Sequence, residues 1–194
     1  MANTDVNTFI ESERERKVKI KEAIQRRKDR EGIKIYTGYF NMMKQYLDAG
    51  CLMISIARTL PKWMKNLQWC EKLIPSYDLF KDRHNITPEE YTERYRAEHP
   101  AKEVVKIVKR LRDDTYYKYG TKYRGIVLCC HESADNFCHR QVVAEECREN
   151  GLEVEEFPVV LSPRTLEFKQ YLKNKEQAEY KQLELDLEVA KSDN

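Results

Sequence analysis

The chain has 194 residues, of which 41% are hydrophobic and 35% charged, and its formal net charge is +2 at pH 7. A net charge this small does not by itself indicate that the whole chain binds nucleic acid. No apolar run approaches the roughly 20 residues of a membrane-spanning helix. The six cysteines lack the density of a small secreted disulfide scaffold. We therefore expect a soluble, cytoplasmic protein with free thiols and no membrane partner.

Charged residues are concentrated at the two ends of the chain. Residues 1–31 contain runs such as Glu-Arg-Glu-Arg-Lys and few apolar positions, a pattern typical of a solvated helix or a flexible arm. Residues 162–194 are also charged, with a broken apolar stripe that indicates a helix. We therefore divide the chain into a charged N-terminal arm, helical or flexible (1–31), an α/β domain (32–161) and a charged C-terminal helix (162–194).

The α/β domain is expected to begin with a strand–helix–strand unit. Residues 33–37 alternate and are rich in β-formers, which predicts a strand that Gly38 ends. Residues 41–47 carry apolar side chains at helical spacing. Residues 51–57 form a nearly continuous apolar run, which is typical of a buried parallel strand. The three segments together predict a compact βαβ unit.

Helices follow in the middle of the chain. Residues 69–83 are mixed in character and are expected to be loop-rich. Thr87, Pro88 and Glu90 form the signature of a helix start, in which the hydroxyl caps the helix and the carboxylate completes a capping box. That helix is expected to end before Pro100, and an apolar face predicts a second helix over residues 102–111.

The remainder of the domain is predicted as strand, helix and strand. Residues 125–130 are apolar, residues 141–149 are helical and end near Gly151, and residues 152–157 mostly alternate, which indicates an edge strand. Together the segments predict an α/β fold. It is a small three-layer domain with a short, mostly parallel sheet and helical N- and C-terminal extensions.

Reactive side chains crowd the segment that joins the strand at 125–130 to the following helix. Cys129, Cys130, His131, Cys138 and His139 all lie there. Free N–H groups and the macrodipole at a helix start favour an anion and lower the pKa of a thiol at the cap. Four interpretations remain open: an anion or nucleotide pocket, nucleophilic catalysis by Cys138 or Cys129 with a histidine base, a metal site, and buried thiols with a structural role alone.

Residue spacing narrows these interpretations. Neighbouring residues of a strand point to opposite faces, so Cys129 and Cys130 are not expected to face one pocket. Neither a Cys-x-x-Cys nor a His-x-x-x-His pair occurs there, so we predict no metal site. Six residues after the two cysteines stand Asp135 and Asn136, not the arginine of a cysteine phosphatase loop. The sequence also contains no glycine-rich phosphate cradle, and we expect no cofactor.

Several segments resemble a known family. They are Ile-Tyr-Thr-Gly-Tyr-Phe at 35–40, Ser-Ile-Ala-Arg-Thr-Leu-Pro-Lys-Trp at 55–63, Glu-Tyr at 90–91, Cys-x-x-Glu at 129–132 and Cys-His-Arg at 138–140. Together they resemble the domain of unknown function family 488 over about residues 34–157. Cys130 and Glu132 match the spacing of the family's Cys-x-Glu pattern, but Cys129 is extra, so either Cys129 or Cys130 holds the family's cysteine position. The family's more familiar Asp-Val-Arg is replaced by Ile-Ala-Arg at 56–58. The resemblance implies a small α/β domain connected with nucleotides or nucleic acid, and no assigned reaction.

Loops at the carboxyl ends of the predicted strands are expected to meet at one rim of the sheet and form a pocket. The predicted catalytic residues are Cys138, His139 and Glu132. The predicted ligand-binding residues are Thr37, Tyr39, Arg58, Lys62, Trp63 and Arg140. Cations beside an aromatic side chain suit a phosphate attached to a flat ring. We therefore predict a phosphorylated or nucleotide-like small molecule, which the protein binds or acts on.

Two other functions are left open by the sequence. Residues 102–124 interleave basic side chains with tyrosines, a pattern found in modules that bind single-stranded nucleic acid, although Glu103, Asp113 and Asp114 dilute the charge. The second alternative is a non-enzymatic interaction protein that assembles through its charged ends. Whether the protein is an enzyme, and which oligomer it forms, does not follow from the sequence.

Overall fold

The computed structural model describes residues 3–65, 67–158, 170 and 174, with side chains from residue 14 onwards. The chain divides into two compact units, Met1–Phe157 and Pro158–Asn194. Apart from positions 170 and 174, the helix predicted over residues 162–194 lies outside the described residues. Within the described part of the chain, no helix is both long and apolar enough to cross a membrane.

The charged N-terminal arm is a helix, α1 (Asn3–Glu31). Most of its described side chains are exposed, as its charge leads us to expect. The carboxyl end of the helix contacts α5 (Ala101–Tyr119). There, the Arg30 guanidinium donates a hydrogen bond to the Tyr117 hydroxyl at 3.0 Å and pairs with the Asp113 carboxylate at 3.5 Å.

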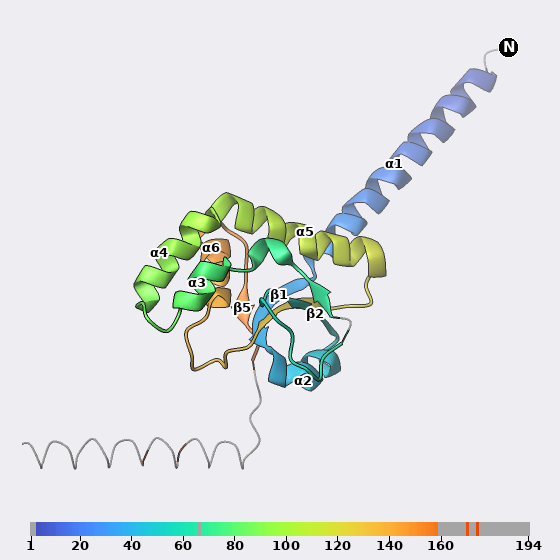
Figure 1. Cartoon of the computed structure of the whole chain (residues 1–194). Helices are drawn as coiled ribbons and strands as arrows, with labels where there is room; N and C mark the ends of the chain where they lie inside the picture. The colour runs from blue at the N-terminus through green and yellow to red at the C-terminus, as the bar shows by residue number, and fades with distance from the viewer. Residues whose placement is uncertain (1–2, 66, 159–169, 171–173, 175–194) are drawn as a thin grey trace, which may run out of the picture. The chain divides into compact units, whose positions relative to one another are not determined.

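The centre of the first unit is a parallel sheet with the strand order β3-β2-β4-β1-β5 (Figure 1). The strands are β1 (Lys34–Tyr39), β2 (Cys51–Ser55), β3 (Gln68–Trp69), β4 (Gly125–Cys130) and β5 (Glu155–Glu156). β4 pairs with β1 on one edge and with β2 on the other. The predicted parallel sheet and the edge strand near residue 155 are confirmed, but β4 separates the two strands of the predicted βαβ unit.

Helices connect the strands. They are the 3-10 turns η1 (Phe40–Met42) and η2 (Glu71–Leu73), and the α-helices α2 (Met43–Asp48), α3 (Tyr77–Asp82), α4 (Pro88–Glu98), α5 and α6 (His139–Glu149). The predicted cap of α4 is confirmed, because Thr87 Oγ1 accepts the Glu90 N–H at 3.2 Å. The helix predicted over 102–111 continues to Tyr119.

Two local predictions were wrong. The region 69–83, expected to be loop-rich, contains η2 and α3. Ser76 starts α3 by accepting the Leu79 N–H with its hydroxyl at 3.2 Å, which is an ordinary N-cap. Gly38 was expected to end the first strand, but it lies inside β1, where it pairs in register with Cys129.

Each face of the sheet carries its own part of the core. Ile126 and Leu128 of β4 pack with the cluster that includes side chains of α3, α4, α5 and α6, whereas Val127 and Cys129 pack with Phe40 and side chains of α2. Figure 1 shows α5 and α2 on opposite sides of the strands. Burial on both faces explains the continuous apolar run in β4, and the predicted three-layer α/β fold is confirmed.

Candidate functional site

A pocket of about 610 Å³ lies beyond the carboxyl ends of β2 and β4, the edge at which parallel α/β sheets hold ligands. Segments from several parts of the chain line it. They include Ala57, Arg58 and Thr59 after β2, Phe80, Arg83 and Tyr91 around α3 and α4, Cys130, His131 and Glu132 at the end of β4, and Phe137, Cys138 and His139 at the start of α6.

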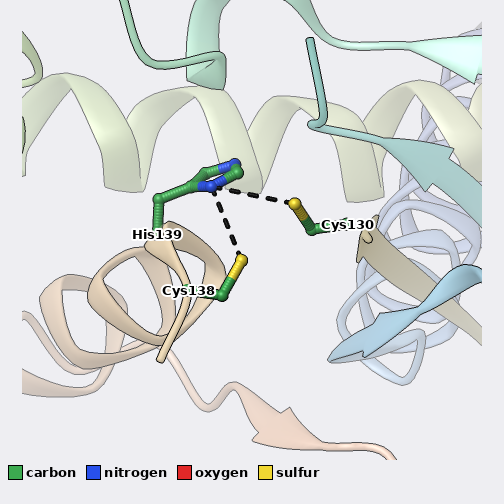
Figure 2. Close-up of side chains that lie close together, drawn as sticks. All are labelled: Cys130, Cys138 and His139. Carbon is green, nitrogen blue, oxygen red and sulfur yellow. Dashed lines mark hydrogen bonds between the residues drawn. The ribbon is translucent and has the colours of Figure 1, made fainter. Parts of the chain in front are cut away.

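Two thiols and an imidazole meet in the lining of this pocket (Figure 2). The Cys130 and Cys138 sulfurs lie 3.8 and 3.6 Å from His139 Nδ1, and the three potential ligand atoms are within 4.8 Å of one another. Cys130 is the last residue of β4 and Cys138 is the N-cap of α6. The fold therefore brings the three together because a strand end and the next helix start are adjacent.

The second ring nitrogen of His139 fixes the orientation of the imidazole. His139 Nε2 lies 2.9 Å from the carbonyl oxygen of Ile56, just after β2. A carbonyl oxygen only accepts hydrogen bonds, so Nε2 carries a proton. Nδ1 therefore faces the two sulfurs, either as an acceptor from a thiol or, in the charged ring, as a donor to a thiolate.

The Glu132 carboxylate completes this group. Its Oε2 atom lies 3.2 Å from the Cys130 sulfur and 3.3 Å from the Cys138 sulfur. The backbone carbonyl of the same residue accepts a hydrogen bond from Arg140 Nη1 at 2.6 Å. The side chain thus has a fixed place between the two thiols. We call Cys130, Glu132, Cys138 and His139 the thiol cluster.

The two thiols of the cluster have opposite acidities. The hydrogen bond from Cys130 and the charge of His139 lower the pKa of Cys138 well below the usual thiol value, against the opposing effect of burial. The pKa of Cys130 is raised by its hydrogen bond to Cys138 and by burial. Burial lowers the pKa of His139, but Cys138, the Ile56 carbonyl and the Glu132 charge together outweigh that effect, so the pKa is raised. Cys138 is therefore the more acidic thiol of the pair.

Cys129, the neighbour of Cys130, lies away from the cluster. The Cys129 sulfur donates a hydrogen bond to the Val127 carbonyl at 3.4 Å. Burial raises the pKa of Cys129 above the usual thiol value. The sequence left open which of the two cysteines holds the family position, and the structure places Cys130 beside Glu132.

Two arginines line the pocket with part of their hydrogen-bonding capacity unused. Arg58 donates through Nη2 to the Pro75 carbonyl, and Arg83 donates through Nη1 to the Phe80 carbonyl at 2.7 Å. The Nε atom of each is buried without a hydrogen-bond partner. Arg83 also lies over the Phe80 ring, with its Cζ 4.0 Å from the centroid. Two half-buried guanidinium groups, each with a buried and unpaired Nε–H, favour an anionic ligand.

Arg140 lies apart from the pocket lining and is fully buried. Its guanidinium donates to the Glu156 carboxylate at 3.2 Å, to the Glu132 carbonyl at 2.6 Å and to the Ser133 carbonyl at 2.9 Å. The hydrogen bonds join β5 to the loop that follows β4. Of the two arginines predicted to bind a ligand, Arg58 lines the pocket and Arg140 supports the loop beside it.

The other predicted ligand-binding residues also lie outside the pocket lining. Thr37 is buried and donates to the Glu156 carboxylate at 2.6 Å. The Tyr39 backbone N–H and carbonyl both bond to the Tyr46 hydroxyl, at 2.9 and 3.0 Å. Lys62 and Trp63 are exposed. Of the predicted site residues, Arg58 and the three predicted catalytic residues therefore line one pocket. Arg83, Phe80 and Tyr91 also line it, but they were not predicted from the sequence.

The basic segment 102–124 carries ion pairs along α5. Lys106 Nζ lies 3.6 Å from the Glu103 carboxylate, and Arg110 Nε lies 3.5 Å from the Asp114 carboxylate. Tyr117 is 70% exposed, but it accepts a hydrogen bond from Arg30 of α1. These pairs reduce the charge that the helix offers to a phosphate backbone.

One comparison with known proteins gave a result. The family model DUF488-N3a, described as the active DUF488-N3 subclade, matches residues 35–151. The chain belongs to the DUF488 family. Searches of curated proteins and of solved structures returned no match. The DUF488 match includes the whole thiol cluster and both pocket arginines, since all of them lie between residues 35 and 151.

Proposed function

We propose that this DUF488 protein is a cysteine-dependent enzyme, with Cys138 as its nucleophile and an anionic, phosphorylated or nucleotide-like substrate in the pocket. The proposal rests on one observation: the Cys138 sulfur lines the pocket with His139 Nδ1 at 3.6 Å and the Glu132 carboxylate at 3.3 Å. A nucleophile within reach of an oriented base is the arrangement that nucleophilic catalysis needs. The description of the matched subclade as active agrees with this proposal.

The two cysteines and the histidine of the thiol cluster each have a role in this reaction. The Cys138 sulfur attacks an electrophilic centre of the substrate, and the leaving group departs with the electron pair of the broken bond. The charged His139 ring donates its Nδ1 proton to that leaving group, and the neutral ring then accepts a proton from the water that releases the product. Cys130 donates a hydrogen bond to the attacking sulfur, and the Ile56 carbonyl holds the ring in place.

The two pocket arginines support the choice of an anionic substrate. Arg58 and Arg83 each keep one buried N–H group unpaired, and a phosphate or carboxylate would satisfy both groups with charge-assisted hydrogen bonds. The aromatic residues Phe80, Tyr91 and Phe137 contribute apolar surface to the same pocket, which suits a flat ring attached to the anion.

Alkylation with two matched reagents tests the proposal without a known substrate. Iodoacetate carries a carboxylate and iodoacetamide does not, and both report on a nucleophilic thiol. In protein treated with a chelator, we expect Cys138 to be the first cysteine that either reagent alkylates, as peptide mass mapping shows. Arg58→Leu and Arg83→Leu should slow iodoacetate by about 10-fold, equivalent to roughly 1.4 kcal/mol, and iodoacetamide much less.

Two controls make the alkylation experiment decisive. Cys138→Ser should abolish the fast reaction, whereas Cys147→Ser should leave it unchanged, because Cys147 is a buried cysteine outside the pocket lining. If another cysteine reacts first, Cys138 is not the nucleophile. If the two arginine variants slow both reagents equally, the pocket has no preference for an anion.

A further inference from the structure

The thiol cluster has a second chemical capacity, which is independent of nucleophilic attack. The Cys130 and Cys138 sulfurs and His139 Nδ1 lie around a common point (Figure 2), and the Glu132 carboxylate lies beside both sulfurs. Acidic groups this close repel one another when ionised. A divalent cation at their centre removes that repulsion. We propose that Cys130, Cys138 and His139 bind one Zn²⁺ through their two sulfurs and Nδ1.

The distances within the cluster match a tetrahedral zinc site. With Zn–S bonds of about 2.3 Å and Zn–N bonds of about 2.05 Å, tetrahedral angles place each sulfur about 3.6 Å from the nitrogen. The observed distances from His139 Nδ1 are 3.8 Å to the Cys130 sulfur and 3.6 Å to the Cys138 sulfur. Binding therefore requires shifts of only a few tenths of an ångström between Nδ1 and the two sulfurs.

The surroundings of His139 favour the same metal. A histidine that binds zinc through one nitrogen usually donates its other N–H to a carbonyl or carboxylate, which orients the ring. His139 already donates Nε2–H to the Ile56 carbonyl, so Nδ1 is left for the metal. Two thiolates and an imidazole select Zn²⁺ over the oxygen-seeking Mg²⁺ and Ca²⁺. Within the described part of the chain, these are the three His, Cys, Asp or Glu residues whose ligand atoms converge in this way.

The spacing of the ligands explains why a search for metal motifs passes over them. Cys130 and Cys138 are separated by a seven-residue loop, and His139 follows directly. Local zinc motifs place paired ligands two to five residues apart. Here the pairing comes from the end of β4 and the start of α6, which are adjacent in space only after the sheet has formed.

Zinc binding and nucleophilic attack exclude each other, because both use the lone pairs of the Cys138 sulfur. Zinc would thus hold the proposed enzyme in an inactive state, from which a chelator or a stronger zinc binder releases it. The inference needs only the geometry of the cluster, and it stands whether or not Cys138 proves to be catalytic.

Cobalt substitution tests the site in the full chain. The protein is reduced, stripped with a chelator, freed of it and titrated with Co²⁺, whose thiolate charge-transfer absorption reports sulfur ligation. We expect one equivalent of Co²⁺ to bind with tetrahedral absorption bands, and Zn²⁺ to displace it. Cys130→Ser, Cys138→Ser and His139→Ala should each weaken binding by more than the about 10- to 100-fold that loss of an outer-shell partner costs. Cys129→Ser and Cys147→Ser should bind as the unmodified protein does.

A second measurement covers the case in which a ligand variant does not fold. In the unmodified protein, Zn²⁺ should slow iodoacetamide alkylation of both Cys130 and Cys138 by at least about 10-fold and leave Cys70 unaffected. Absence of a thiolate charge-transfer band, or equal alkylation with and without Zn²⁺, would overturn the zinc site. Neither result bears on the alkylation order in metal-free protein, so failure of the zinc site and failure of the proposed nucleophile are separate outcomes.

Discussion

Replacement of Gly38 by alanine should destabilise the protein through a single crowded contact. A Cβ atom at this position would lie 2.4 Å from the Tyr46 hydroxyl oxygen and 3.0 Å from Val127 Cγ1. Tyr46 is fully buried, and its hydroxyl bonds to both backbone groups of Tyr39. Overpacking of this kind costs about 1–3 kcal/mol, and displacement of the phenol loses two hydrogen bonds of about 1 kcal/mol each. We expect Gly38→Ala to lower the free energy of unfolding by about 3 kcal/mol.

Urea denaturation followed by circular dichroism measures this change, and a double-mutant cycle identifies its cause. Tyr46→Phe alone should lower the free energy of unfolding by about 1–2 kcal/mol, because the two hydrogen bonds to Tyr39 are lost. Since the same change removes the atom nearest to the new methyl group, the double variant should be more stable than the sum of the single effects by about 1 kcal/mol. A Gly38→Ala variant within about 0.5 kcal/mol of the unmodified protein, or strictly additive effects, would refute the steric explanation.

Three further predictions concern buried charges. Arg140→Met should lower the free energy of unfolding by about 3 kcal/mol, because Glu156 and the carbonyls of the loop after β4 lose their donor. Chemical denaturation measures this change, and a loss below about 1 kcal/mol would contradict the supporting role of the buried guanidinium. Arg96→Ala should lower the free energy of unfolding by about 2 kcal/mol, because Glu146, only 4% exposed, loses its counterion. Adding Glu146→Leu should restore part of this stability. No recovery in the double variant would argue against the unpaired Glu146 charge as the cause of the loss. Burial lowers the pKa of His99. As the pH drops below about 6.5, the imidazole is therefore protonated more readily in the unfolded chain than in the folded one, and the stability of the protein falls. His99→Gln should show a smaller fall in melting temperature between neutral and mildly acidic pH, and parallel curves for the two proteins would exclude His99 as a source of that fall.

Much of the fold follows from patterns within short segments. The apolar runs at 51–57 and 125–130 became β2 and β4, because burial on both faces of a sheet leaves a continuous hydrophobic signal. Gly38 shows where such reasoning fails. Its role depends on the Tyr46 side chain, which occupies the space of the missing Cβ, and no local pattern reveals that contact. The position of β4 between β1 and β2 likewise depends on pairing between segments far apart in the chain.

Some residues of the candidate site could likewise be predicted from a short segment of sequence, and others could not. Cys138, His139 and Glu132 are near one another in sequence and lie at a strand-to-helix junction, so they were predictable as a group. Arg83 was not, because its place in the pocket depends on α3, a six-residue helix in a region that looks irregular in sequence. Arg140 was assigned to a ligand because a planar guanidinium at a helix start suits a phosphate or carboxylate. Its burial and three acceptors give it a supporting role instead.

The thiol cluster joins parts of the chain that should differ greatly in their hydrogen-exchange rates. Cys130 ends β4, which is paired along both edges with β1 and β2, so its amides should exchange only when the whole unit unfolds. Residues 134–137, just before Cys138, are exposed, and their amides should exchange through small local openings. One sulfur is thus anchored in the slowest-exchanging strand and the other follows a segment that opens readily.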